Sequence, residues 1–177
     1  MIGFFYPQVC NQQGDQGYRD WLEAHEVSTC AVEDSEVSGL NSLLVGDVSE
    51  RGARILRSKL EGHWILKAIN DGLTVLAIGR AAIEVSKALD LQAPMHSYKS
   101  QFVETEFQGE KLYGYVNGLC DMNRLVTETQ VGKGRLITCA LLGPVAVVNP
   151  GFEKYCFGLE TSERAELTQH YKKLATD

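Results

Sequence analysis

The apolar positions in the first half of the chain follow two alternating patterns. Short runs that are almost wholly apolar predict buried strands, and longer tracts with apolar positions three or four residues apart predict helices. The predicted strands are residues 2–6, 28–32, 40–45 and 73–78. The predicted helices are residues 16–26, 50–70 with an interruption near Gly62, and 80–89. This alternation predicts a parallel sheet with helices on both faces.

The second half has strand-like segments that are joined by short turns containing glycine. Two pairs of these segments predict antiparallel hairpins: residues 102–107 with 111–116, and residues 125–131 with 135–141. Asn149-Pro150 opens a short helix toward Phe157, and Thr161 is placed to cap a final helix that ends near Ala175.

Together these patterns predict one α/β domain over residues 1–177, of the flavodoxin-like three-layer type. Its central sheet is expected to be mostly parallel, with helices on both faces and antiparallel additions in the C-terminal half. The 177 residues are enough for one sizeable core, and 44% of them are hydrophobic, which is ordinary for a globular protein. The formal net charge is −6, without a run of Lys or Arg. This balance disfavours nucleic acid and anionic membranes as partners, because both attract basic patches.

Targeting signals and cysteine usage indicate where the chain works. The N-terminus lacks the charged and apolar segments of a signal peptide, and no apolar stretch reaches the ~18 residues that span a membrane. The five cysteines are odd in number, widely spaced and without a Cys-x-x-Cys pair. This usage is typical of reduced thiols rather than a disulfide framework or a zinc site. We therefore expect a cytoplasmic protein without membrane insertion, metal or cofactor.

The tract from Leu73 to Ile83 contains the most informative local pattern. An apolar strand runs directly into a helix, with Gly79 at the bend. In many α/β enzymes such a strand-to-helix elbow displays the catalytic nucleophile. Gly79 has no side chain that could attack a substrate, so the elbow lacks its reactive atom.

Four segments, in order along the chain, resemble class I glutamine amidotransferases of the branch that includes cobyric acid synthase. The similarity is greatest to the glutaminase subunit of lipid II isoglutaminyl synthase. The segments are Tyr6-Pro7 with Asn11-Gln12-Gln13-Gly14-Asp15-Gln16-Gly17, the tract 68–82 with its elbow, Gly114-Tyr115-Val116-Asn117, and Leu141-Leu142-Gly143-Pro144 with Asn149-Pro150. The first segment is the most specific, since the family opens with Tyr-Pro followed by Asn-x-x-Gly-Asp-x-Gly. The third is similar to Gly-Phe-Glu-Asn and the fourth to Leu-His-Gly-Pro.

The resemblance implies a definite chemistry. In the family a cysteine thiolate attacks the side-chain amide of glutamine, a histidine activates the thiol and protonates the leaving ammonia, and backbone N–H groups stabilise the oxyanion. The ammonia passes to a Mur-ligase-like partner protein, which amidates the lipid II stem peptide. The resemblance places the pocket and its signature at Asn11, Gly14, Asp15, Gly46, Arg80, Asn117, Gly143 and Pro144.

The chain departs from the family pattern at the positions that decide the chemistry. Gly79 stands at the position of the cysteine, and Leu142 at that of the histidine. A triglycine turn expected after the third strand is reduced to Gly46, followed by Asp47-Val48. Loss of the nucleophile or the base alone removes orders of magnitude in rate. The sequence therefore predicts a glutaminase fold with no catalytic residues at the family site.

Three functions remain open from the sequence. The leading one is a catalytically degenerate amidotransferase-like protein that binds a Mur-ligase-like protein or an active paralogue. The second is an active enzyme with a relocated nucleophile, for which Cys10 or Cys120 would be the candidate; as the alternative, each thiol is simply buried. The third is a sensor for a glutamine-like ligand, whose carboxylate Arg80 would pair.

Other titratable residues have bland interpretations beside the functional ones. The four histidines share no metal-ligand spacing: His25, His63, His96 and His170. Glu104 and Glu106 share one face of a predicted strand, as either an acid–base pair or a solvated face. The loop from Asn11 to Gly17 is either a turn held by Asx side chains and glycines or a surface kept for docking.

Overall fold

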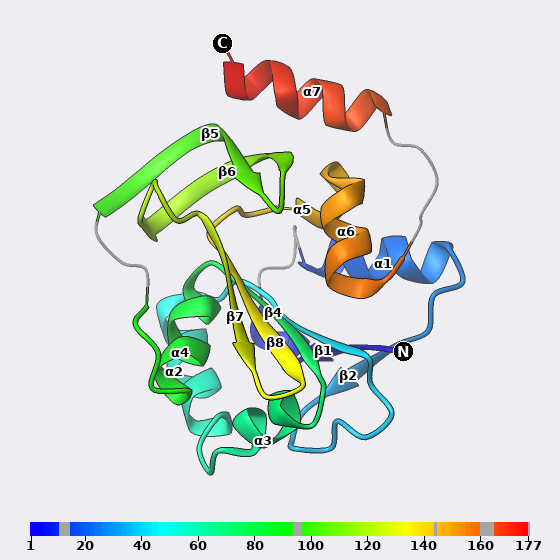
Figure 1. The fold of residues 1–177 in the computed structure, drawn as a ribbon, viewed down its shortest axis with the longest axis vertical. Helices are drawn as coiled ribbons and strands as arrows, with labels where there is room; N and C mark the ends of the chain where they lie inside the picture. The colour runs from blue at the N-terminus through cyan, green and yellow to red at the C-terminus, as the bar shows by residue number, and fades with distance from the viewer. Residues whose placement is uncertain (11–14, 94–96, 144, 160–164, 177) are drawn as a thin grey trace.

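The apolar runs of the first half form the parallel core of a six-stranded sheet (Figure 1). The structure is a computed structural model that describes residues 1–10, 15–93, 97–143, 145–159 and 165–176. The strands are β1 (Ile2–Phe5), β2 (Thr29–Val32), β3 (Ser42–Val45), β4 (Thr74–Ile78), β7 (Val126–Val131) and β8 (Gly134–Cys139). Their order is β2-β1-β3-β4-β8-β7, and all neighbours pair in parallel except the edge strand β7, which pairs antiparallel with β8. The predicted sheet is therefore confirmed.

Helices cover both faces of the sheet, as predicted. One face packs against α2 (Glu50–Lys59), α3 (Trp64–Asn70) and α4 (Arg80–Ala88) in a core that includes Leu43, Leu56 and Val75. The other face packs against α1 (Gly17–Ala24), α5 (Val145–Val148) and α6 (Pro150–Phe157) in a core that includes Leu44 and Leu76. Neighbouring residues of β3 and β4 thus enter opposite cores, because successive side chains of a strand point to opposite faces. A short 3-10 helix, η1 (Pro7–Val9), follows β1.

The tract 50–70 shows why the predicted interruption occurs. Ser49 caps α2, because its Oγ accepts a hydrogen bond from the Gly52 N–H at 3.1 Å. The helical path ends where Gly62 and His63 both take positive φ angles, of 89° and 57°. A second helix, α3, then starts at Trp64. The predicted break near Gly62 is confirmed.

The first predicted hairpin is longer than expected and does not join the main sheet. β5 (Ser97–Phe107) and β6 (Glu110–Cys120) pair antiparallel as a separate two-stranded sheet. The prediction was too short because polar residues such as Ser100 and Asn117 break the apolar pattern while the backbone pairing continues through them. Val103, Leu112 and Val116 carry the inner face of the hairpin into the core on the α1 and α6 side.

The C-terminal helix α7 (Ala165–Thr176) packs on the hairpin. The rings of Phe102 and Tyr171 meet edge to face with centroids 5.8 Å apart. The predicted cap Thr161 lies outside the described residues. The short helix α5 was not predicted, because Val145, Val147 and Val148 are typical of a strand rather than a helix.

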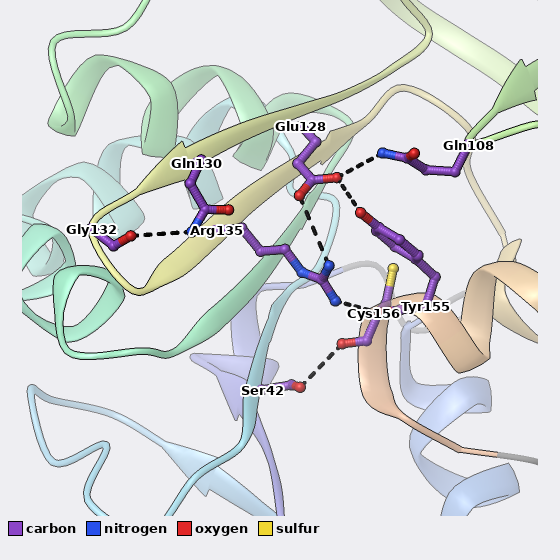
Figure 2. A network of polar contacts seen from close by, with 8 residues as sticks. All are labelled: Ser42, Gln108, Glu128, Gln130, Gly132, Arg135, Tyr155 and Cys156. Atoms are coloured by element: carbon purple, nitrogen blue, oxygen red, sulfur yellow. Dashed lines mark hydrogen bonds and ion pairs between the residues drawn. The ribbon is translucent and has the colours of Figure 1, made fainter.

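A polar network ties α6 and the hairpin turn to the edge of the main sheet (Figure 2). The Tyr155 hydroxyl on α6 donates to Glu128 Oε2 on β7 at 2.5 Å, and Gln108 Nε2 from the β5–β6 turn donates to the same oxygen at 3.0 Å. Arg135 Nη2 on β8 donates to the Tyr155 carbonyl at 2.6 Å, and its guanidinium lies 4.2 Å from the centre of the Tyr155 ring. These contacts fix the second sheet relative to the first.

Within the described part of the chain, none of the helices combines the length and apolar character that crossing a membrane requires.

Candidate functional site

The elbow predicted at Gly79 is present as a sharp turn between β4 and α4. Gly79 has φ 57° and ψ −127°, outside the regions that residues with a side chain normally occupy. Its N–H donates to the carbonyl of Cys139 on β8 at 2.7 Å, so the turn is anchored to the neighbouring strand. The backbone therefore has the strained strand-to-helix form that displays a nucleophile in other α/β enzymes.

The space beside Gly79 is already filled. A Cβ atom built on Gly79 would lie 2.3 Å from Asp47 Oδ1 and 2.8 Å from Leu142 Cδ2, closer than real Cβ contacts allow. Asp47 comes from the turn after β3, and Leu142 from the segment after β8. The two side chains thus occupy the position from which a nucleophile would project.

The Asp47 carboxylate also takes the first donor of the helix that follows. The Arg80 N–H donates to Asp47 Oδ1 at 2.8 Å. Burial raises the pKa of Asp47, while hydrogen bonds from the Arg80 and Val48 N–H groups and the charge of Arg80 oppose that rise. In acyl-transfer enzymes the N–H after the nucleophile is an oxyanion donor, and here it is bound by a carboxylate of the same chain.

Leu142 contacts the elbow from a backbone that is itself held by the hairpin. Its N–H donates to the Tyr115 carbonyl on β6 at 2.7 Å, and the two residues form an isolated antiparallel bridge. Its side chain is half-buried and apolar, and cannot accept or donate a proton. No part of Leu142 can serve as a general base.

A cavity of about 150 Å³ opens beside the elbow. It is lined by Asp47, Val48, Ser49, Gly79, Arg80, Ile83, Val116, Asn117, Gly118, Leu119, Cys120, Ala140 and Leu142. The structure thus brings together four of the residues singled out in the sequence, Gly79, Arg80, Asn117 and Leu142. Arg80 and Asn117 are exposed, and Asn117 Oδ1 accepts a hydrogen bond from the Tyr98 hydroxyl at 2.5 Å.

Asp15, Gly46 and Gly143 lie apart from this cavity lining. Asp15 is buried against the end of β3, where a Cβ on Gly46 would lie 2.2 Å from its Oδ2. Gly143 has φ 82° and borders a cavity of only about 10 Å³ beside Asp15. These residues therefore support close packing of the loops. The remaining signature residues, Asn11, Gly14 and Pro144, lie outside the described residues.

The two candidate cysteine nucleophiles are in environments that disfavour a thiolate. Burial, followed by the charge of Asp15, raises the pKa of Cys10 to about 12, and its Sγ donates to the Tyr6 carbonyl at 3.5 Å. Burial also raises the pKa of Cys120, which lines the cavity beside Gly79. A nucleophilic cysteine needs the opposite shift, since the thiolate is the reactive form.

Cys10 and Cys120 are therefore expected to resist alkylation in the folded protein. With a pKa of about 12, only about one Cys10 thiol in ten thousand is ionised at pH 8. Iodoacetamide or a glutamine-analogue electrophile, followed by peptide mapping, measures this directly. Protein unfolded in urea serves as the control and should label at all five cysteines. Labelling of native Cys10 or Cys120 at the rate seen in urea would contradict the expectation.

The acidic pair on the hairpin is a solvated face. Glu104 forms an ion pair with Lys111 on the neighbouring strand, with Nζ 2.7 Å from Oε1. This partner lowers the pKa of Glu104, which favours the charged form and not a proton donor. Across the described ranges, no three His, Cys, Asp or Glu residues are grouped closely enough to hold a metal ion.

Asp47 is the residue of this site whose role the sequence pattern does not reveal. In the sequence it stands out only as a departure from a triglycine turn. Its position one residue after Gly46, at the carboxyl end of a predicted parallel strand next to the elbow strand, was the available signal. Parallel neighbours end at the same edge of a sheet, so a side chain there can reach the elbow.

No protein-family model matches the chain, and no curated protein sequence matches it. Several solved structures are similar to it. A GMP synthase component from Thermoplasma acidophilum, so named in its description, aligns with a TM-score of 0.50 and 16% identity, over 80% of this chain and 83% of that one. A GH42 β-galactosidase from G. stearothermophilus aligns with a TM-score of 0.51 and 13% identity, over 87% of this chain. A glutamine amidotransferase from Thermotoga maritima aligns over 99% of this chain and 88% of that one, with a TM-score of 0.48 and 10% identity.

At these identities the likeness concerns the fold alone. The chain has a mixed α/β fold of the glutamine amidotransferase-like type. It spans only 30% of the galactosidase chain that it matches. Because proteins with different activities share this architecture, the function has to be argued from the site.

Proposed function

We propose that this protein is a catalytically inactive relative of the glutamine amidotransferases that acts by binding. One observation carries the proposal: the position from which a nucleophile would project at Gly79 is filled by the Asp47 carboxylate, with Leu142 beside it. The strained backbone of the elbow is retained although the reactive atom is absent. Such an arrangement fits a fold that has been kept after its chemistry was lost.

Each chemical requirement of glutamine hydrolysis is unmet at this elbow. A thiolate nucleophile, a general base and free oxyanion donors are needed together. Gly79 supplies no nucleophile, Leu142 supplies no base, and the Arg80 N–H already donates to Asp47. The raised pKa values of Cys10 and Cys120 argue against a relocated cysteine.

The partner we propose is a cytoplasmic Mur-ligase-like protein or an active paralogue of this chain, in the amidation of a cell-wall precursor. This part of the proposal rests on the ordered sequence resemblance to the glutaminase subunit of lipid II isoglutaminyl synthase. Hydrophobic burial and core packing preserve the fold independently of catalysis, so a protein can retain its docking role after losing its reaction.

A ligand-binding role at the same cavity is the second candidate. The exposed guanidinium of Arg80 and the amide of Asn117 both border the 150 Å³ cavity. Within the described residues, no carboxylate oxygen lies within 4.0 Å of the Arg80 guanidinium. A glutamine-like molecule could place its carboxylate against this side chain at the mouth of the cavity.

The proposal is tested by measuring ammonia release from L-glutamine with the purified protein, alone and with a Mur-ligase-like protein. We expect no release above that of buffer, whereas an active glutamine amidotransferase measured in parallel releases ammonia. Complex formation is measured in the same samples by size-exclusion chromatography, and L-glutamine binding by a rise in melting temperature. Release at a rate near that of the active enzyme would overturn the proposed loss of catalysis. Absence of both a complex and a glutamine-dependent shift would overturn the binding role.

A further inference from the structure

The Asp47 carboxylate crosses from one strand end to another. Asp47 lies in the turn after β3, yet its Oδ1 is 2.8 Å from the backbone N of Arg80 at the start of α4. The side chain is half-buried, and burial raises its pKa. A carboxylate in such a place is stabilised only by the hydrogen-bond donors and positive charge around it.

The place it occupies has the properties of an anion position. α4 has nine residues, and the unpaired N–H groups and dipole at a helix N-terminus favour negative charge. The Arg80 guanidinium adds a positive charge that acts on Asp47. The occupant is seated where a Cβ on Gly79 would stand, and Leu142 closes the other side. Only a group about the size of one carboxylate has room there.

We propose that Asp47 is an internal ligand that occupies the anion position of the elbow and thereby sets the charge preference of the neighbouring cavity. Carboxylates and oxyanions from solution are excluded from the Arg80 N–H, because Asp47 both fills the position and repels them. A neutral amide or a cationic group can approach the Asp47 carboxylate instead. This inference concerns the native elbow and stands whether or not the protein binds a Mur-ligase-like partner.

Truncation of Asp47 tests the idea with acetate, which reproduces the missing side-chain carboxylate. In Asp47→Ala, sodium acetate at ten times its dissociation constant should raise the folding equilibrium constant about tenfold, or the melting temperature by about 3–5 °C. Wild type and Asp47→Asn should show no acetate effect beyond that of sodium chloride at equal ionic strength. Asparagine is the matched control because its Oδ1 can fill the same position and accept from the Arg80 N–H.

A second control separates site occupancy from a general response to a lost helix cap. Ser49→Ala also removes an N-cap acceptor, from α2, but leaves no carboxylate-sized space at the elbow. We expect Ser49→Ala to be insensitive to acetate. An acetate effect of equal size in Asp47→Ala and Ser49→Ala, or no effect in either, would overturn the proposal.

Wild-type protein supplies a test that does not depend on the folding of Asp47→Ala. The amide proton of Arg80, followed by ¹H–¹⁵N NMR, should shift as Asp47 is protonated, because its hydrogen bond to a carboxylate becomes one to a neutral acid. The same amide in Asp47→Asn should show no such titration. Identical pH profiles in the two proteins would overturn the proposal. Neither result depends on the glutaminase assay, so the two proposals fail separately.

Discussion

Gly79→Ala is expected to lower the free energy of unfolding by about 3 kcal/mol. The φ of 57° with ψ of −127° is strained for a residue with a side chain, and the new Cβ would overlap Asp47 Oδ1 at 2.3 Å. The reduced entropy of the unfolded chain returns only about 0.4–1 kcal/mol. Thermal unfolding measures the effect, which corresponds to a fall of about 6–12 °C in Tm for a chain of this size.

Two matched variants make this result specific to the elbow. Gly118→Ala adds the same methyl group on the lining of the same cavity, where nothing lies within 4 Å of the new Cβ, and should change stability by less than about 0.5 kcal/mol. Asp47→Gly combined with Gly79→Ala should recover part of the loss, because the overlapping carboxylate is gone. Equal destabilisation by Gly79→Ala and Gly118→Ala would contradict the account of the elbow.

Asn149→Ala is expected to cost about 3 kcal/mol of stability, because the Asn149 side chain links the hairpin to α5. The buried amide accepts from the Tyr113 N–H at 2.8 Å and donates to the Tyr113 carbonyl at 2.9 Å and the Val145 carbonyl at 2.8 Å. Alanine would leave both main-chain groups of Tyr113 buried without this partner. Urea unfolding monitored by circular dichroism gives the difference in free energy.

The comparison variant for Asn149 is Asn117→Ala, on the strand β6 that Asn149 holds. Asn117 is exposed and its one recorded side-chain bond is with the exposed Tyr98 hydroxyl, so water replaces that bond readily. We expect a loss below about 1 kcal/mol. If the two substitutions destabilise equally, the three bonds of Asn149 do not hold the hairpin as described.

The parallel core was predictable because burial on both faces makes a strand apolar throughout. Leu43 to Val45 and Val75 to Ile78 belong to such runs, and each lies in the centre of the sheet. The elbow followed from the same logic, since a buried strand that meets an amphipathic helix leaves a single residue for the turn. Gly79 could therefore be located from sequence alone.

The extent of the hairpin and the content of the site needed the structure. Ser100 and Asn117 stand in β5 and β6 on a face that is not buried, so no apolar alternation marks them as strand. Asp47 and Gly79 are 32 positions apart, and their contact depends on the register between β3 and β4. Local patterns of hydrophobicity contain no information about such a contact.

The backbone of the elbow makes the loss of a nucleophile easier than its return. A side chain at the position of Gly79 stores strain that glycine releases, so any lineage with this turn gains stability when selection for catalysis ends. Once Asp47 has filled the vacated space, a new side chain meets a steric barrier as well as the original strain. Reversion then requires two compatible changes at once, so the elbow works as an evolutionary ratchet.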